Sequence, residues 1–120
     1  MDMCVFCLAE NSNRASMIVK RLKRLGIEDD GISVVMPNAE RDERSASLAL
    51  VEFGDLAARG PVVGALTRDP PSKRDGLAKA LVEIGVPRTD ADVCQAGVKA
   101  GRVFISVSPH AYEGRRAIEL

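Results

Sequence analysis

The sequence predicts an α+β fold in which helices cover a small sheet of three to four strands. Three observations predict it: a β-α-β order at the start, two amphipathic helices in the second half, and a further apolar strand after them. The length of 120 residues suits one domain, so we expect 1–120 to fold as a unit. We expect the arrangement of a ferredoxin-like split β-α-β sandwich, with the helices on one face of a mostly antiparallel sheet.

The first unit begins with an apolar run over 3–9, which has no alternation and is typical of a strand covered on both faces. A helix over 13–25 follows, because its apolar residues share one stripe at helical spacing. The inward residues are Ala15, Ile18, Val19, Leu22 and Leu25, and the outward cations are Arg14, Lys20, Arg21, Lys23 and Arg24. Gly26 ends this helix and Ile27 folds back onto it. A second strand covers 32–36 and ends at Pro37.

The middle of the chain is less regular. Residues 37–47 are charged and predict a solvated loop, whereas 48–59 match neither a strand nor a helix. Gly60-Pro61 can open a short helix through Leu66, since proline suits the first helical position. The Asp-Pro-Pro-Ser run at 69–72 predicts the next break.

The second half contains two predicted helices. The first covers 73–84, buries one apolar face, and ends at Gly85. Its inward residues are Leu77, Ala80, Leu81 and Ile84. The second runs to about Ala100, and Thr89 and Asp92 have the spacing of a capping box at its start.

The last predicted elements are a strand and a helix. Residues 103–107 are nearly all apolar, so we expect this strand, like the one at 3–9, in the centre of the sheet. Ser108-Pro109 then opens a final helix, with Ala117 and Leu120 facing inward.

Read together, these segments resemble the bacterial general stress proteins of the heat-induced (YflT-like) family. The shared motifs are Gly60-Pro61, the helix end ALVEIGVP at 80–87, the helix end GVKAG at 97–101 and the strand VFISV at 103–107. The opening strand, helix and "Gly-Ile" turn also resemble that family. The resemblance implies an α+β domain associated with stress, and it implies no catalytic residues.

The composition argues against several functions. Lys plus Arg and Asp plus Glu number 17 each, so no large field of one sign attracts nucleic acid or an anionic membrane. One Tyr, three Phe and no Trp are too few for a base-stacking surface. The apolar run that ends at Ala9 has no basic segment before it, so it does not match a secretory signal peptide. No stretch approaches the 20 or so apolar residues that span a bilayer. We therefore expect a cytoplasmic protein that binds neither membrane nor nucleic acid.

The three cysteines, Cys4, Cys7 and Cys94, are expected to be reduced core residues. Cys4 and Cys7 form a C-x-x-C pair, but residues three apart on a strand face opposite sides, which does not suit a redox or metal site. His110, the single histidine, has no evident nucleophile or orienting partner. The carboxylates at 28–30 and 40–43 have no metal-loop spacing. We predict no metal, no cofactor and no catalytic residue.

Two sites could bind a partner or ligand. Asn11, Ser12, Asn13 and Arg14 form a strand-to-helix turn whose free N–H groups and guanidinium could hold an anion. No glycine-rich fingerprint accompanies this turn, which favours the alternative of a plain helix cap. The cationic face of helix 13–25 could recognise an acidic partner or a phosphate, and the alternative is a solvated face.

Three functions remain open after these observations. The first is a non-catalytic interaction or regulatory module of a bacterial stress response. The second is a small-molecule or anion-binding regulatory domain that uses residues 11–14, and the third is an enzyme of unknown type. A short sheet with a free edge also predicts a homodimer or larger homo-oligomer.

Overall fold

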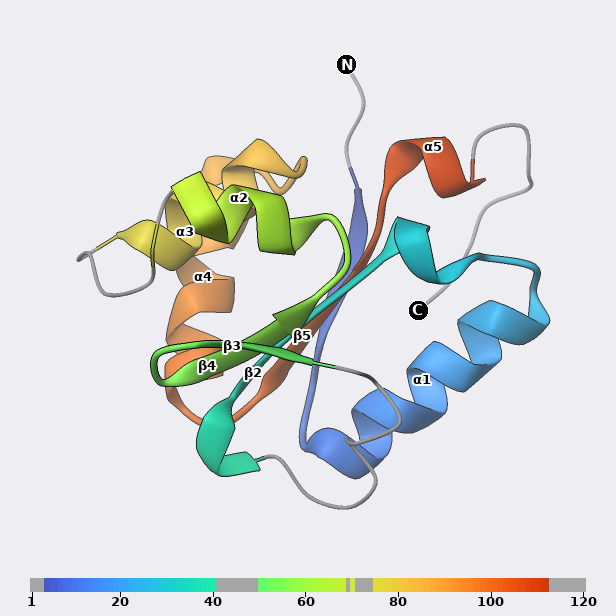
Figure 1. Cartoon of the computed structure of the whole chain (residues 1–120), viewed down its shortest axis with the longest axis horizontal. Helices are drawn as coiled ribbons and strands as arrows, with labels where there is room; N and C mark the ends of the chain where they lie inside the picture. The colour runs from blue at the N-terminus through green and yellow to red at the C-terminus, as the bar shows by residue number, and fades with distance from the viewer. Residues whose placement is uncertain (1–3, 41–49, 69, 71–74, 113–120) are drawn as a thin grey trace.

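In the part of the chain that the structure describes, five strands form one antiparallel sheet in the order β1-β5-β2-β4-β3 (Figure 1). The computed structural model describes residues 4–40, 50–68, 70 and 75–112. The strands are β1 (Val5–Ala9), β2 (Ile32–Pro37), β3 (Val51–Phe53), β4 (Leu56–Arg59) and β5 (Val103–Val107). The α+β class is therefore confirmed.

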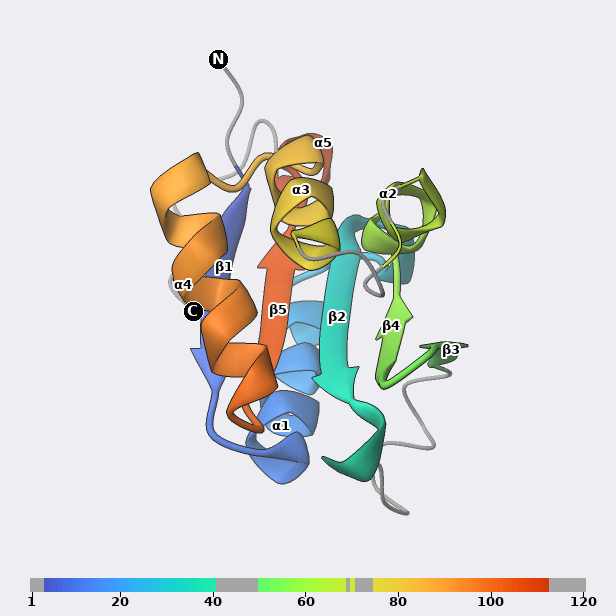
Figure 2. The ribbon, with the colours of Figure 1, turned by 90° about the vertical axis from the view of Figure 1, so that its left-hand side faces the viewer.

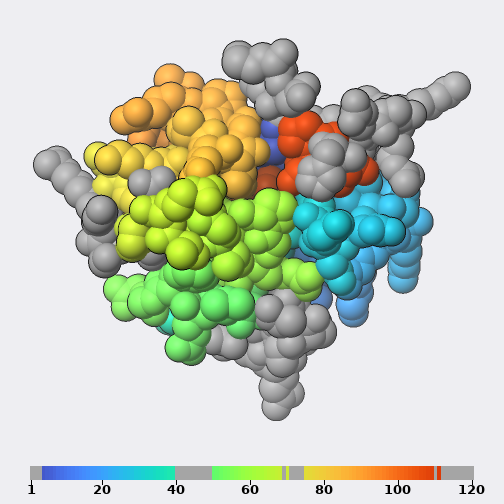
Figure 3. All heavy atoms as spheres, turned by 45° about the horizontal axis from the view of Figure 1, so that its top comes forward, coloured from blue at the N-terminus to red at the C-terminus, as the bar shows by residue number. Residues whose placement is uncertain are grey.

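Helices cover both faces of this sheet, so the expectation of helices on one face was wrong. The helices are α1 (Ser12–Arg24), α2 (Val62–Arg68), α3 (Gly76–Glu83), α4 (Arg88–Lys99) and α5 (Pro109–Tyr112), with 3-10 turns η1 (Asp29–Gly31) and η2 (Asn38–Glu40). Helix α1 lies behind the sheet in Figure 2, and α2, α3 and α4 lie in front of it. The space-filling view shows α2 and α3 packed side by side into a continuous surface (Figure 3).

The core is divided into two clusters because alternate strand residues face opposite layers. On β5, Phe104 packs with the residues of α2–α4, whereas Ile105 packs with those of α1. On β2, Val35 and Val34 divide in the same way. All four side chains are fully buried, which explains why these strands are apolar without alternation.

The first β-α-β unit is split by the last strand. Strand β5 is antiparallel to both β1 and β2, so β1 and β2 run in the same direction with β5 between them. The sheet has five strands among the described residues, rather than the three to four expected. The additional pair is the β3–β4 hairpin, whose two-residue turn at Gly54-Asp55 places Gly54 at φ +62°.

Strand β1 lies at an edge of the sheet, so its expected central position was wrong. It pairs with β5 along all five of its residues and with no other described strand. Its apolar character comes instead from the helices on its two faces, since both α1 and α4 contact it. Strand β5 has neighbours on both sides, and its predicted range and central position are confirmed.

Helix α1 begins and ends at local signals. The Arg14 N–H donates to Oδ1 of Asn11 over 2.9 Å, as an N-cap requires. At the other end Gly26 adopts φ +91°, and the Ile27 N–H donates to the Leu22 carbonyl over 3.1 Å. This turn buries Ile27 and leaves Leu25 51% exposed, so the expected inward position of Leu25 was wrong.

At the starts of α2 and α3, backbone N–H groups donate hydrogen bonds to side chains that are distant in sequence. The Val62 N–H donates to the buried Ser33 hydroxyl over 3.1 Å, and the Ala78 N–H donates to Oε1 of Gln95 over 2.9 Å. Asp75, the residue before α3, makes no side-chain cap.

Helix α4, like α3, has no side-chain cap from the residue before it. It begins at Arg88, directly after Pro87. The expected capping box of Thr89 and Asp92 is therefore wrong, since Thr89 already lies inside the helix. Of the loop predicted over 37–47, residue 37 ends β2, residues 38–40 form η2, and residues 41–47 lie outside the described residues. Most of the break at 69–72, and Ala117 and Leu120, also lie outside them.

Candidate functional site

The outer side of α1 carries a cationic surface, which we call the basic face. Its residues are Arg14, Met17, Lys20, Arg21 and Arg24, all exposed. No residue of α1 is acidic, although the whole chain has equal numbers of cationic and acidic residues. Positive charge is therefore concentrated on this helix and balanced elsewhere in the chain.

A shallow groove of about 370 Å³ runs along the basic face. Met17, Lys20, Arg21 and Arg24 line it, so its walls are largely the thioether and the aliphatic stems of the cations. Met17 is 55% exposed, so its side chain is open to contact from solvent. The groove thus offers an apolar contact surrounded by three positive charges.

The cations that line the groove have no ion-pair partner among the described residues. Lys23, one turn away, does have one: its Nζ lies 2.9 Å from Oδ1 of Asp29, and Nη2 of Arg59 lies 3.5 Å from the same oxygen. The hydrogen bond from Lys23, helped by the charge of Arg59, lowers the pKa of Asp29. Lys23 is consequently paired with a carboxylate of the same chain, whereas Lys20, Arg21 and Arg24 present their charge to solvent.

The four residues predicted as an anion site lie at the start of α1 and differ in exposure. Asn11 uses its side chain to cap the helix, and Ser12 is buried. Asn13 and Arg14 are exposed. The capping alternative accounts for Asn11, while anion binding by this turn stays a prediction.

The cysteines are structural in their surroundings. Cys4 belongs to the cluster beneath α2–α4, and Cys7 packs against the cluster beneath α1, so the two residues of the C-x-x-C pair face opposite sides as predicted. Cys4, Cys7 and Cys94 are all free thiols. Burial raises the pKa of Cys4 and of Cys94 to about 11, and it raises the pKa of Cys7 as well. At neutral pH these thiols are protonated and weak nucleophiles.

Other predicted residues do not assemble into a reactive group. In the part of the chain that the structure describes, no three His, Cys, Asp or Glu residues lie together as metal ligands would. His110 lies in α5, and the carboxylates of 28–30 are exposed around η1. Residues 41–43 lie outside the described part.

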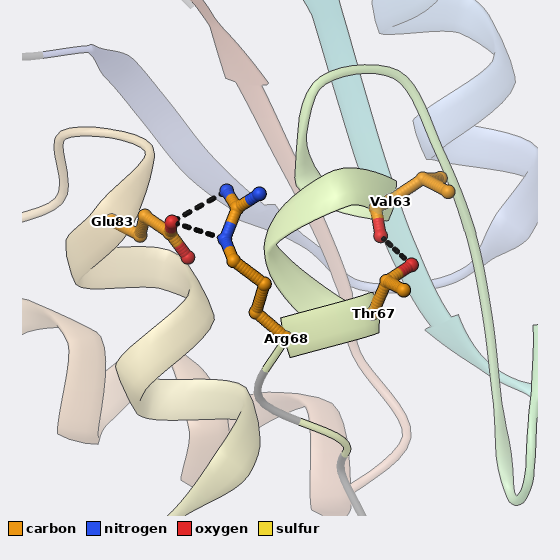
Figure 4. A network of polar contacts seen from close by, with 4 residues as sticks. All are labelled: Val63, Thr67, Arg68 and Glu83. Atoms are coloured by element: carbon orange, nitrogen blue, oxygen red, sulfur yellow. Dashed lines mark hydrogen bonds and ion pairs between the residues drawn. The ribbon is translucent and has the colours of Figure 1, made fainter.

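An exposed ion pair joins α2 to α3. Arg68 donates from Nε to Oε1 of Glu83 over 2.7 Å, and on the same helix the Thr67 hydroxyl donates to the Val63 carbonyl over 2.9 Å (Figure 4). Both Arg68 and Glu83 are solvent-exposed, so the pair adds little to stability. Arg68 is thus paired with a carboxylate, in contrast to Lys20, Arg21 and Arg24 of the basic face.

Sequence analysis found the cations of the basic face but missed the groove and Met17. The signal was present, because Met17 follows Arg14 by three residues and precedes Arg21 by four, which places all three on one helix stripe.

No helix among the described residues has both the length and the apolar character needed to cross a membrane. Comparison with known proteins found no similar family model, curated protein or solved structure.

Proposed function

We propose that this protein is a non-catalytic interaction module of a bacterial stress response, and that its basic face binds an acidic segment of a partner protein. The observation that carries this proposal is the groove in which exposed Met17 lies among Lys20, Arg21 and Arg24. Such a surface suits a segment in which carboxylates flank an apolar side chain. The carboxylates would pair with the cations, and the apolar side chain would pack against Met17.

The same surface favours a protein segment over nucleic acid. Phosphate binding gains from many cations spread over a wide area, whereas here three cations line one short groove on a chain with no net charge. Aromatic residues make up only 3% of the chain, which limits base stacking. The apolar contact at Met17 has no counterpart in a phosphate backbone.

The non-catalytic part of the proposal is supported by the cysteines. Their burial and raised pKa values leave the most nucleophilic side chains of the chain protonated at neutral pH.

The assignment to a stress response is supported by the resemblance of the helix ends at 80–87 and 97–101 to general stress proteins. The split β1–α1–β2 unit is the feature that supports a ferredoxin-like classification of this part of the chain. A heat-induced rise in the abundance of the protein in its native cell, followed by immunoblotting, would test the role in stress. Unchanged abundance under heat, oxidative and osmotic stress would contradict it.

Binding of a labelled acidic peptide tests the interaction directly. The probe is a fluorescent peptide with alternating Glu and Leu, and fluorescence anisotropy measures its Kd at low and physiological salt. We expect Lys20→Gln/Arg21→Gln/Arg24→Gln to raise Kd roughly threefold to hundredfold, since each exposed charge pair contributes about 0.2–1 kcal/mol. Met17→Ala should weaken binding to a smaller extent, and added salt should weaken it for the unmodified protein.

A matched control moves the same charge change to other elements. Lys79→Gln/Lys99→Gln/Arg102→Gln alters three exposed cations on α3, on α4 and after α4, and it should leave Kd unchanged. Equal losses in both triple variants would contradict a specific site on α1. Tighter binding of a single-stranded oligonucleotide or of anionic vesicles than of the peptide would also contradict the proposal.

A further inference from the structure

The two edges of the sheet differ in how well they are protected against pairing with another strand. Strand β3 has only three residues and carries Glu52, and short length and charge are both devices that block edge pairing. Strand β1 has five residues, none of them charged and none of them proline. It also pairs with β5 without a bulge, so its outer backbone is straight enough to accept a further strand.

The side chains of β1 indicate that this edge is incompletely covered. Val5, Phe6, Cys7 and Leu8 are each only half-buried, whereas all five residues of β5 beside them are buried. The faces of β1 are already occupied, because α1 contacts one face and α4 contacts the other. On the α4 side the packing is close: a Cβ added at Gly97 would lie 2.6 Å from Cδ1 of Leu8. The remaining exposure therefore lies toward the open edge, which is at the left margin of the sheet in Figure 2.

We infer that a second copy of this chain pairs with β1 to form a two-fold dimer with a continuous ten-stranded sheet. Every strand pair in the sheet is antiparallel, and a two-fold axis supplies an antiparallel neighbour automatically. Because β1 has no charge, pairing it with itself places no like charges opposite one another. The net charge of zero also removes long-range repulsion between copies.

The centre of β1 gives this dimer a chemical marker. A two-fold axis through the middle of the strand places Cys7 opposite Cys7 of the second copy, with Cβ atoms roughly 4.5–5.5 Å apart. Cys7 is also more exposed than Cys4 and Cys94, which are buried. A short bismaleimide, which adds each of its two rings to one thiol, would therefore link the two copies through Cys7.

The dimer also has a consequence for binding by the basic face, and this consequence rests on the proposed function. A two-fold axis perpendicular to the sheet keeps both copies of α1 on the same face, and α1 lies over β1 and β5 beside the axis. The two basic faces are then presented on one side of the dimer. A partner with two acidic segments would bind both, and the second contact would be intramolecular.

Oligomeric state and cross-linking test the dimer without reference to any partner. Light scattering coupled to size exclusion, run from micromolar to submillimolar protein, should give a dimer mass that dissociates on dilution. Bismaleimide, applied at alkaline pH because burial raises the pKa of the Cys7 thiol, should produce a covalent dimer of the unmodified protein and none of Cys7→Ser. A monomer mass at every concentration, or an undiminished covalent dimer in Cys7→Ser, would overturn the inference.

A pair of lysine substitutions separates the two edges. Cys7→Lys places two like charges opposite each other at the axis and should raise the dimer Kd roughly tenfold or more. Val51→Lys puts the same charge on β3 at the opposite edge and should leave the dimer unchanged. A dimer that resists Cys7→Lys, or that Val51→Lys dissociates equally, would overturn the assignment to β1. The cross-linking experiment covers the case in which Cys7→Lys does not fold.

The same reagents distinguish failure of the dimer from failure of the proposed function. A single acidic peptide binds one basic face, so its Kd should be equal for the unmodified protein and for Cys7→Lys. A peptide with two acidic segments on a flexible linker should bind the unmodified protein more tightly, and Cys7→Lys should lose that gain. Loss of single-peptide binding alone would reject the proposed function and leave the dimer standing.

Discussion

Helix α1 and the helices α2 and α3 cover opposite faces of one sheet, yet their starts are determined in different ways. Asn11 caps α1 from three residues away, whereas Ser33 and Gln95 reach α2 and α3 across 29 and 17 residues of sequence. Helix α1 has 13 residues, and α2 and α3 have seven and eight. Helices that short are marginal alone, so the packed sheet stabilises them. One layer is specified locally and the other by tertiary contacts.

Phe104→Ala tests the dependence of the three-helix layer on the sheet and has the largest expected effect. Phe104 is fully buried beneath α2–α4 and lies 6.3 Å from Phe6 between ring centroids. We expect the free energy of unfolding to fall by about 3–5 kcal/mol, measured by urea denaturation. Ile105→Ala, on the α1 face of the same strand, is the matched comparison. If hydrogen exchange accelerates only in α2–α4 for Phe104→Ala and only in α1 for Ile105→Ala, the two helix layers unfold independently.

Ser33→Ala tests the tertiary start of α2 directly. The substitution leaves the Val62 N–H without its acceptor in a buried position, which should cost about 1–3 kcal/mol. Amide exchange in α2 should accelerate more than exchange in α1. Thr67→Ala serves as control, because it removes a hydrogen bond on the exposed side of the same helix. Equal acceleration in both helices would contradict a local role for Ser33.

Asn11→Ala tests the local start of α1. Loss of the N-cap should lower the free energy of unfolding by about 1 kcal/mol, and Asn11→Asp should retain most of it. Exchange of the first amides of α1 reports the change residue by residue. Faster exchange in α2 instead would indicate that α1 also depends on distant contacts.

Asp29→Asn has the smallest expected effect and tests the link from the end of α1 to β4. Asp29 is half-exposed, so its pairs with Lys23 and Arg59 should contribute only a few tenths of a kcal/mol. Its pKa is lowered, so this contribution is present above the ordinary value of 3.8 and is lost as pH falls through the lowered pKa. The difference in Tm between the unmodified protein and Asp29→Asn should therefore disappear in acid. A difference that persists there would rule out the charge as its cause.

The elements with local signals were predictable from sequence. Helix α1 has a cap, an apolar stripe and Gly26, and β5 is an unbroken apolar run, so both were placed to within a residue. The β3–β4 hairpin was missed although Gly54-Asp55 is a two-residue hairpin signal, because the three residues of β3 are too few to establish a strand pattern.

Features that depend on tertiary neighbours were not predictable. The start of α2 requires Ser33 beside it, and Gly60 is required because a Cβ at φ +86° would lie 2.0 Å from the Ile32 carbonyl oxygen. The edge position of β1 also escaped prediction, since an apolar run reports covered faces and says nothing of strand neighbours. The cations of the basic face were predictable because helical spacing alone places them on one side of α1. The groove was not, because its volume depends on how the four side chains lie in three dimensions.

The position of β5 between β1 and β2 has a consequence during synthesis. The ribosome makes β1, α1, β2 and the β3–β4 hairpin before the strand that joins them, so the nascent chain holds two apolar strands with no partner between them. Sheet closure must wait until residue 107 has emerged, and until then the exposed strand edges invite aggregation. The sheet of this chain is therefore completed only after β5 has been made, and chaperones that shield apolar segments should increase its yield.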